Sequence, residues 1–213
     1  MKKPKQSRGE QKRAEIVAVA KELFFKEGYA GASMAQIAAK VGGSKATLYN
    51  HFRSKEELLL AVVESAEAQQ PLEPRDAGAA PAAEAVKNMT ALRAWLFRFG
   101  CESLARLTSY ELVSLQRLAA AEAARLPDVG RIFLEGGVAP AFAQFTPVFA
   151  AAMDRGLIRK APPEQAAEHF TEMCTGWLMR RVIWGLEPAP DAARIAANVE
   201  PAVNAFLDGY APR

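Results

Sequence analysis

Residues 33–57 read SMAQIAAKVGGSKATLYNHFRSKEE, and their local chemistry marks two short helices. Ser33 precedes a run of apolar residues at helical spacing and is followed three residues later by Gln36, a capping-box pattern that begins a helix. The glycine pair at 42–43 supplies the backbone freedom to end that helix in a turn. Ser44 is a natural N-cap. The stretch therefore predicts two short helices joined by a glycine turn.

The second of these helices is expected to separate its inward and outward faces. Leu48 and Phe52 lie four residues apart on the inward face. The residues left for other faces are Lys45, Ala46, Thr47, Tyr49, Asn50 and His51. Ser54 and Glu57 then repeat the capping-box spacing and open a further helix. This pattern indicates a helix-turn-helix, a motif whose second helix reads the DNA major groove.

Residues 10–63 resemble the DNA-binding domain of the tetracycline-repressor (TetR) family of bacterial transcriptional regulators. Three stretches carry the resemblance: FFKEGYAGAS, MAQIAAKVG and SKATLYNHFRSKEELL. Gly43 departs from the pattern, because valine is common there, and Ala46 stands where glycine is frequent. We expect Gly43 to weaken packing at the turn, by roughly 0.5 to 1 kcal/mol, without changing the function.

The resemblance implies how individual residues contact DNA. Base reading falls to three residues near the start of the recognition helix, Lys45, Ala46 and Thr47. Contacts to phosphates are implied for Ser33, Ser44, Tyr49, His51 and Lys55. Asn50 completes the DNA-facing set. The alternatives are a packing role for Tyr49 or His51 and simple solvation of Asn50.

Charge is distributed unevenly along the chain. Residues 1–60 carry twelve Lys/Arg against six Asp/Glu, whereas residues 61–213 carry fifteen against eighteen. A basic end on an otherwise slightly acidic chain is typical of a DNA-facing module and predicts salt-dependent binding. Residues 1–8 are expected to be a flexible basic arm, which either touches DNA or is a solvated tail without a role.

The whole chain is expected to be all-α, with a three-helix DNA-binding domain at 9–66 and a larger ligand-binding and dimerisation domain at 67–213. A first amphipathic helix, ended by Gly28, is expected over 9–27. A loop rich in Pro and Ala is expected over 69–85. Later helices are expected at 89–107, 110–124, 127–155 with a break near 136–137, 163–184 and 190–208. Thr90 and Ser109 are the expected caps of the first two.

The second domain resembles the C-terminal domain of a TetR subgroup associated with efflux-pump and envelope regulation. Family membership implies a homodimer in which the last two helices pair with their copies. The expected interface residues are Ala167, Phe170, Cys174, Trp177, Leu178, Arg181, Val203 and Phe206. A pocket for a small hydrophobic or amphipathic effector is implied inside this domain. Its expected lining is Trp95, Phe99, Phe142, Phe145, Phe149, Met153, Phe170, Met173 and Trp177, with ordinary core packing as the alternative for each.

Other classes of protein find little support. The histidines are His51 and His169 alone, and no nucleophile–base pair, phosphate-binding glycine loop or metal motif occurs, so neither an enzyme, a metal site nor a cofactor is expected. No apolar run of membrane-spanning length or secretory signal is found, which favours a cytoplasmic location without membrane partners. Cys101 and Cys174 are expected to be buried apolar residues, with a redox role left open.

The prediction is a sequence-specific transcriptional regulator. Its expected form is a repressor that binds a palindromic operator, double-stranded DNA, as a homodimer and releases it on binding a small molecule. An activator and a non-specific architectural DNA-binding protein are the alternatives.

Overall fold

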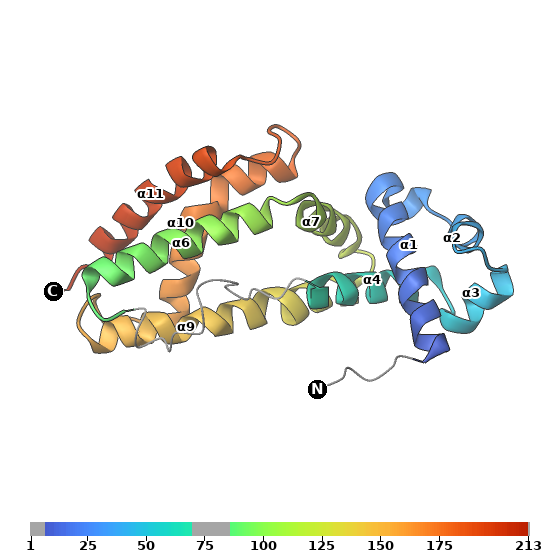
Figure 1. Ribbon diagram of the computed structural model, residues 1–213, viewed down its shortest axis with the longest axis horizontal. Helices are drawn as coiled ribbons and strands as arrows, with labels where there is room; N and C mark the ends of the chain where they lie inside the picture. Colours follow the sequence, from blue (N-terminus) through green and yellow to red (C-terminus); the bar gives the residue numbers. More distant parts are fainter. Residues whose placement is uncertain (1–6, 70–85, 213) are drawn as a thin grey trace. The chain divides into compact units, whose positions relative to one another are not determined.

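The computed structural model describes residues 7–69 and 86–212, with the side chains of 66–69 and 136–144 left out. Every regular element in these ranges is a helix (Figure 1). The all-helical fold class is thus confirmed. No helix of the described ranges is both long and apolar enough to span a bilayer.

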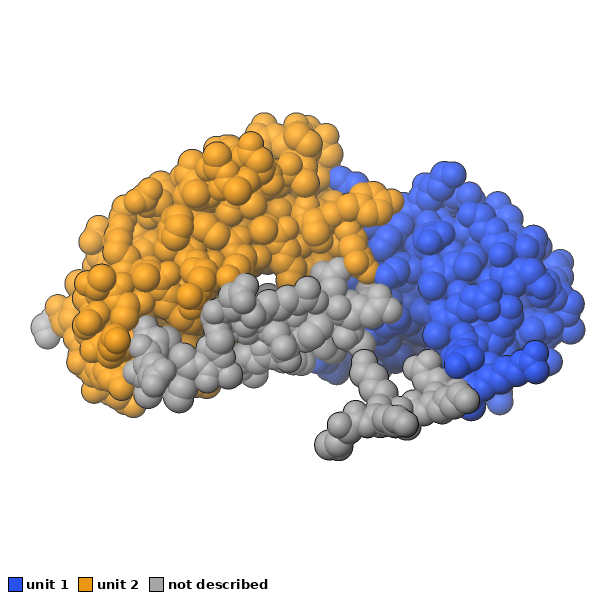
Figure 2. Space-filling model, viewed as in Figure 1, with its two compact units in different colours: residues 1–70, 114–137 blue, residues 71–113, 138–213 orange. Residues whose placement is uncertain are grey.

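Two compact units make up the chain (Figure 2). One contains residues 1–70 and 114–137, and the other contains residues 71–113 and 138–213. The sequence-based division placed a single boundary after residue 66, whereas a segment from the middle of the chain packs with the N-terminal helices. A single cut cannot describe this arrangement, because the contacts between the middle segment and the N-terminal helices are long-range.

The first unit is built around α1 and α4. α1 packs against α2 and α4, and α4 also packs against α8. The inward side chains of these helices are fully buried, as their spacing predicted; they include Ile16, Leu23, Phe24, Ile37, Leu48, Phe52, Leu58 and Leu59. Its helices are α1 (Arg8–Gly31), α2 (Met34–Lys40), α3 (Lys45–His51), α4 (Lys55–Gln69), the later part of α7 (Tyr110–Glu122), and α8 (Pro127–Ile132).

Helix α1 is longer than expected at both ends. Ser7 is its N-cap: the Ser7 hydroxyl accepts the Glu10 N–H at 3.2 Å, and the Glu10 carboxylate accepts the Ser7 N–H at 2.7 Å. Of the expected arm, Ser7 therefore caps the helix and Arg8 is its first residue, while residues 1–6 lie outside the described residues. Gly28, with φ +73° and ψ +166°, interrupts the helix where an end was expected, and a further short helical stretch continues to Gly31.

The second unit is organised around α10. Its helices are α6 (Met89–Leu107), α9 (Ala139–Asp154), α10 (Pro163–Ile183) and α11 (Ala192–Gly209). α10 packs against α6, α9 and α11, and α6 packs against α11. The close approach of α6 requires Gly100, because a Cβ there would lie 2.7 Å from Val199 Cγ1 and 3.0 Å from Cys174 Sγ. No side chain larger than glycine fits this crossing without displacing its neighbours.

Two local expectations in this part of the chain need correction. The cap of α6 is Asn88, not Thr90, because the Asn88 side-chain oxygen accepts the Ala91 N–H at 2.8 Å. The break expected near residues 136–137 is a π-helix, η1 (Phe133–Val138), which connects α8 to α9 without a loop. Ser109 does cap α7, with its hydroxyl 3.3 Å from the Leu112 nitrogen. Residues 70–85 of the expected loop are outside the described residues.

Candidate nucleic-acid interface

The turn between α2 and α3 is a Schellman motif. Gly42 has φ +66°, a conformation that costs a side-chain-bearing residue about 1 to 2 kcal/mol. The Gly42 N–H donates to the Ala39 carbonyl at 3.2 Å, and the Gly43 N–H donates to the Ala38 carbonyl at 3.1 Å. Gly43 occupies the position where this motif usually adds an apolar contact. Gly43 has no side chain to make that contact, and the expected weakening of packing at the turn stays a prediction.

We call residues 33–57, which contain α2, α3 and the start of α4, the reader. Side-chain caps define where its three helices begin. The hydroxyl of Ser33 accepts the Gln36 N–H at 3.2 Å, and the hydroxyl of Ser44 accepts the Thr47 N–H at 3.1 Å. Ser54 caps α4 by accepting the Glu57 N–H at 3.1 Å. The Glu57 carboxylate accepts from Arg53 N–H at 2.7 Å, one residue earlier than the ordinary capping box.

Helix α3 turns Leu48 and Phe52 fully inward, as its spacing predicted. Lys45, Ala46 and Asn50 are exposed, and Tyr49 retains 47% of its accessible surface. Tyr49 thus keeps nearly half of its surface available for contacts outside the chain. Thr47 and His51 are half-buried at the edges of the exposed face. The predicted base-reading residues thus share one solvent-facing helix surface, which is what a groove-reading helix requires.

Two side chains of α1 support the reader from behind. The Lys12 ammonium donates to the Val41 carbonyl at 3.0 Å, which satisfies a carbonyl at the end of α2. The guanidinium carbon of Arg13 lies 4.7 Å from the ring centroid of Phe52, the residue that ends α3. Sequence reasoning missed both residues. Neither contact has a local signal, because the partners are far apart in the chain.

Lys55 stands at the first position of α4, with its ammonium 4.2 Å from the ring centroid of Tyr29. Burial lowers the pKa of the Lys55 ammonium, the attraction of Glu56 and Glu122 opposes this, and Arg125 adds to it. The side chain is half-buried rather than fully solvated. Lys55 is therefore held near the start of α4, where its charge adds to the positive end of the helix dipole.

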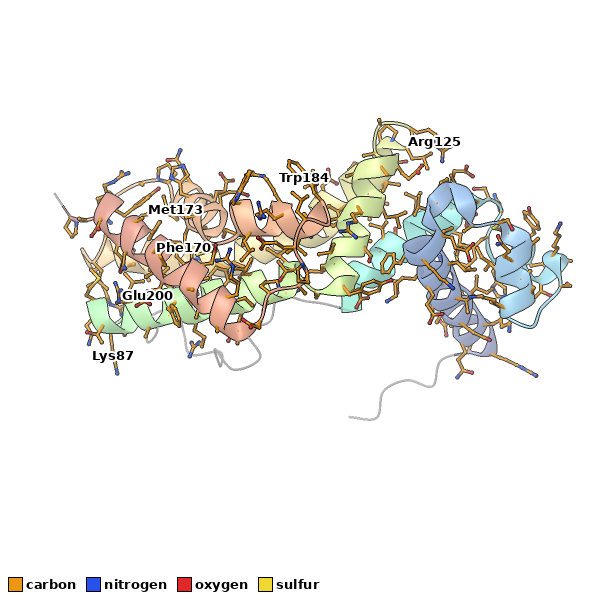
Figure 3. All side chains as sticks on the ribbon, turned by 90° about the horizontal axis from the view of Figure 1, so that it is seen from above. Lys87, Arg125, Phe170, Met173, Trp184 and Glu200 are labelled. Atoms are coloured by element: carbon orange, nitrogen blue, oxygen red, sulfur yellow. The ribbon has the colours of Figure 1, made fainter. Side chains whose placement is uncertain are left out.

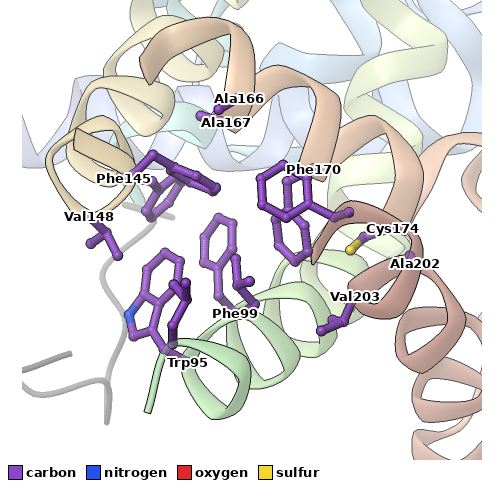
Figure 4. Packing of buried hydrophobic residues seen from close by; sticks show 14 of the residues in the cluster. Trp95, Phe99, Phe145, Val148, Ala166, Ala167, Phe170, Cys174, Ala202 and Val203 are labelled. Atoms are coloured by element: carbon purple, nitrogen blue, oxygen red, sulfur yellow. The ribbon is translucent and has the colours of Figure 1, made fainter. Parts of the chain in front are cut away.

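The aromatic residues predicted to line a pocket form the core of the second unit (Figure 4). The Phe99 ring centroid lies 5.0 Å from that of Trp95 and 4.1 Å from that of Phe145. Phe149 and Phe170 join the same cluster, at 6.1 Å from one another. Met153 is also buried in it.

Three other residues of the predicted pocket lining behave differently. The side chain of Phe142 lies outside the described part of the chain. Met173 and Trp177 are 46% and 66% exposed, so their prediction as lining of an internal pocket is wrong. Trp177 lies seven residues after Phe170, close to two helical turns, so the two side chains start near one side of α10 although one is buried and the other exposed.

Most of the residues predicted to form the dimer interface are not available to a partner in the structure. Six of the eight residues are buried inside the protomer and have no surface left for a partner: Ala167, Phe170, Cys174, Leu178, Val203 and Phe206. Arg181 is half-buried and pairs with Glu187 at 2.6 Å. Trp177 is the one exposed member of the set, at 66%. Met173 and Trp184, which Figure 3 labels, are also exposed; they come four residues before Trp177 and seven residues after it, where α10 ends. The sequence therefore identified an apolar helix, but most of the side chains expected at the interface pack inside the protomer.

The two cysteines have little thiolate character. Burial raises the pKa of Cys174 to about 12, with a smaller effect from Cys101. The pKa of Cys101 is raised as well, chiefly by burial. A protonated thiol is a poor nucleophile and a poor metal ligand. Within the described residues, no group of three or more metal-ligating side chains converges.

Comparison with known proteins agrees with these features. Residues 16–62 match the family described as bacterial regulatory proteins, tetR family, and residues 94–212 match the AefR-like transcriptional repressor, C-terminal domain. A TetR-family regulator from Mesorhizobium loti is similar in structure, with a TM-score of 0.77, 30% identity and coverage of 97% of this chain and 100% of that one. The flavonoid-responsive regulator FrrA has a TM-score of 0.66 and 27% identity, covering 96% of this chain and 99% of its own.

The matches to two curated relatives each cover about a quarter of this chain. The transcriptional activator FasR of Mycolicibacterium smegmatis is 44% identical over 55 residues, 26% of this chain and 25% of its own length. The regulator QacR of Staphylococcus aureus is 44% identical over 48 residues, 22% of this chain and 26% of its own. The chain thus spans about a quarter of the length of these relatives. With both of its domains matched, the chain belongs to the TetR family of DNA-binding transcriptional regulators, with an AefR-like C-terminal domain.

Proposed function

We propose that this regulator is a repressor that binds a palindromic operator as a homodimer and releases it on binding a small hydrophobic molecule. The exposed face of α3, held by the Ser44 cap and the Gly42 turn, is the observation that carries the proposal. An AefR-like repressor domain over residues 94–212 favours repression. The similarity to the activator FasR covers 55 residues, 26% of this chain, which is too little to bear on the sign of regulation. Operator DNA would place the protein in the bacterial cytoplasm.

In this proposal the reader divides its contacts into two kinds. Lys45, Ala46 and Thr47 face base edges, since they lie at the start of α3 on its exposed side. Phosphate contacts come from Ser33, Ser44, Tyr49, His51 and Lys55, and Asn50 lies beside them. The backbone N–H groups at the capped start of α4 add positive potential near Lys55.

The exposed apolar stripe of α10 supports a homodimer. Trp177 and Trp184 keep 66% and 67% of their accessible surface, and Met173 keeps 46%. Large side chains gathered in this way on a soluble domain usually mark a protein interface. A two-fold dimer would bring two copies of α3 to half-sites roughly 34 to 36 Å apart on DNA. Specific binding of a palindrome depends on this pairing, because one α3 contacts too few bases.

The aromatic cluster of the second unit supports an apolar effector. The rings of Trp95, Phe99, Phe145 and Phe149 supply flat hydrophobic surface and few polar groups. The similar regulator FrrA is named for its response to flavonoids, which are flat aromatic molecules. An effector that enters this cluster must separate side chains that now pack together. It would then stabilise a different arrangement of the unit and lower the affinity for operator DNA.

Selection of bound sequences from a random duplex pool, at moderate salt with competitor DNA, tests the reader. Enrichment of a palindrome is the expected result. Binding at low salt without enrichment would instead identify a non-specific DNA-binding protein. Transcription from a promoter carrying the selected operator then gives the sign of regulation, and repression is expected.

Two lysine variants test the division of contacts. Lys45→Ala should change the preferred bases, whereas Lys55→Ala should weaken all sequences alike and reduce the dependence of log Kobs on log salt by about one. Lys160→Ala is the matched control, because this exposed lysine pairs with Asp154 in the second unit. If both reader variants behaved like the control, the assigned contacts would be wrong.

Trp177→Glu tests the dimer, because a charge in an apolar interface opposes association. The expected result is a monomer in sedimentation and at least tenfold weaker binding to the palindrome, an effect of about 1.4 kcal/mol. Gln165→Glu adds the same charge at another exposed position of α10 and should leave the dimer intact. If Trp177→Glu were still a dimer, the interface would have to lie on a surface that does not include Trp177.

Fluorescence can test the effector site. In a Trp177→Phe, Trp184→Phe variant, Trp95 is the remaining tryptophan and reports on the aromatic cluster. Titration with a panel of flavonoids should change its emission at the concentrations that release operator DNA. Release of DNA without any change at Trp95 would place the effector at another site.

A further inference from the structure

Tyr29 anchors a cluster of charged residues behind the reader. Its ring is buried, with 7% of the residue exposed, and its hydroxyl donates to the Glu56 carboxylate at 2.9 Å. The Lys55 ammonium lies 4.2 Å from the ring centroid, and the Arg125 guanidinium carbon lies 5.0 Å from it. Two cations therefore share one aromatic ring. We call Tyr29, Lys55, Glu56, Glu122 and Arg125 the Tyr29 cluster.

The members of the Tyr29 cluster come from separate parts of the first unit. Tyr29 belongs to α1, Lys55 and Glu56 begin α4, Glu122 ends α7, and Arg125 follows it. Arg125 lies 3.3 Å from the Glu122 carboxylate and 3.8 Å from that of Glu56. Two cations are balanced by two carboxylates.

Glu56 and Glu122 are the acidic partners of Arg125. Hydrogen bonds from its own backbone N–H and from the Tyr29 hydroxyl hold the pKa of Glu56 below its ordinary value, and Arg125 contributes as well. The Glu122 side chain is only 15% exposed, so its charge is poorly screened by water. Without Arg125, Lys55 would remain as a cation whose charge both carboxylates attract. An ion pair there would compete with a DNA phosphate for the ammonium of Lys55.

We infer that Arg125 is a positioning residue for the phosphate contact of Lys55, because it occupies the carboxylates of Glu56 and Glu122. The inference rests on the proposed role of Lys55 in binding DNA. With Arg125 present the Tyr29 cluster is neutral, and the Lys55 ammonium remains available. Loss of the guanidinium leaves a net charge of −1 beside Lys55, which draws the ammonium inward and repels the DNA backbone. Arg125 itself needs no contact with DNA.

The salt dependence of binding to a random-sequence duplex measures phosphate contacts directly, because each contact contributes about 0.9 to the slope of log Kobs against log salt. Lys55→Ala should lower the slope by about one and weaken binding about eightfold at 0.1 M salt. Arg125→Gln, which removes the charge but keeps the side chain's length, should reproduce both effects. Arg125→Lys should retain most of the parent slope.

A compensating variant separates the possible origins of the effect. Arg125→Gln combined with Glu122→Gln restores neutrality in the Tyr29 cluster, and the slope should return to the parent value. In the variant that combines Lys55→Ala with Arg125→Gln, the slope should fall no further than in Lys55→Ala alone. Circular dichroism melting of each variant checks that the fold is retained, and Arg125→Lys keeps the test decisive if Arg125→Gln unfolds.

Two results would overturn the inference. The first is an unchanged slope of log Kobs against log salt in Arg125→Gln. The second is a slope lowered by about two in the combined Lys55→Ala, Arg125→Gln variant, without recovery of the slope when Glu122→Gln is added to Arg125→Gln. The second result would make Arg125 a direct phosphate ligand. A parent slope in Lys55→Ala would instead refute the proposed phosphate contact of Lys55, whatever the Arg125 variants do. The two failures are therefore distinguishable.

Discussion

The reader and the aromatic core of the second unit are stabilised in opposite ways. In the reader, Ser33, Ser44 and Ser54 bond to backbone groups three residues away, and the turn closes through Gly42. In the aromatic core, Phe170 contacts rings from α6, α9 and α11. Residues proposed to contact DNA are therefore largely distinct from the residues that stabilise the fold. Exposed reader residues can be exchanged at small cost to the fold, whereas exchanges in the core are expected to act on the whole unit.

Phe170→Ala should have the largest effect on stability. Phe170 is fully buried, with its ring centroid 5.2 Å from that of Phe206 and 6.1 Å from that of Phe99. Its truncation should lower the free energy of unfolding by about 3 to 5 kcal/mol, measured by chemical denaturation at one fixed protein concentration. Glu168→Ala, at an exposed site of the same helix, is the control and should stay within about 0.5 kcal/mol of the parent. Similar losses in the two variants would contradict the core assignment.

Gly100→Ala should have the next largest effect, a loss of about 1 to 3 kcal/mol through overpacking. The added Cβ would meet Val199 Cγ1 at 2.7 Å and Cys174 Sγ at 3.0 Å. Gly209→Ala provides the contrast, since nothing lies within 4 Å of a Cβ there. Thermal unfolding of both variants checks the comparison, and an unchanged Tm in Gly100→Ala would show that the helices can separate without cost.

The two glycines of the reader turn should respond with opposite signs. Gly42→Ala must adopt φ +66° and should cost about 1 to 2 kcal/mol. Gly43→Ala has ordinary space, with the nearest side-chain atom 3.7 Å from its Cβ, and should stabilise the protein by about 0.4 to 1 kcal/mol. Denaturation midpoints distinguish the two. Equal shifts would mean that the turn does not require the left-handed conformation.

Much of the fold could be predicted because its signals are local. The start of α6 at Met89 and of α10 at Pro163 agrees with expectation, as does the burial of Leu48 and Phe52. Asn88 replaced Thr90 as a cap because several polar residues precede α6, and only the backbone geometry selects the one whose oxygen reaches an N–H. The exact first residue of a helix thus depends on backbone geometry within one helical turn.

The faces of α10 could not be predicted in the same way. This helix carries large apolar residues all round, with Phe170 and Leu178 inward and Met173 and Trp177 outward. Phe170 and Trp177 are seven residues apart and lie near one side of the helix by spacing, so periodicity cannot show that the neighbouring helices cover one of them and leave the other exposed. The assignments of Met173 to a pocket and of Phe170 to an interface failed for this reason.

The sequence by itself determined the helix-turn-helix and the helical class, because capping, glycine turns and apolar spacing act over a few residues. Only the tertiary structure decided which face of α10 is buried, which glycine lies at the helix crossing, and that Lys12 and Arg125 contact the reader. Lys12 reaches Val41, and Arg125 reaches Tyr29, across long stretches of chain. Such contacts depend on how helices pack in space, and no pattern within a single helix encodes them.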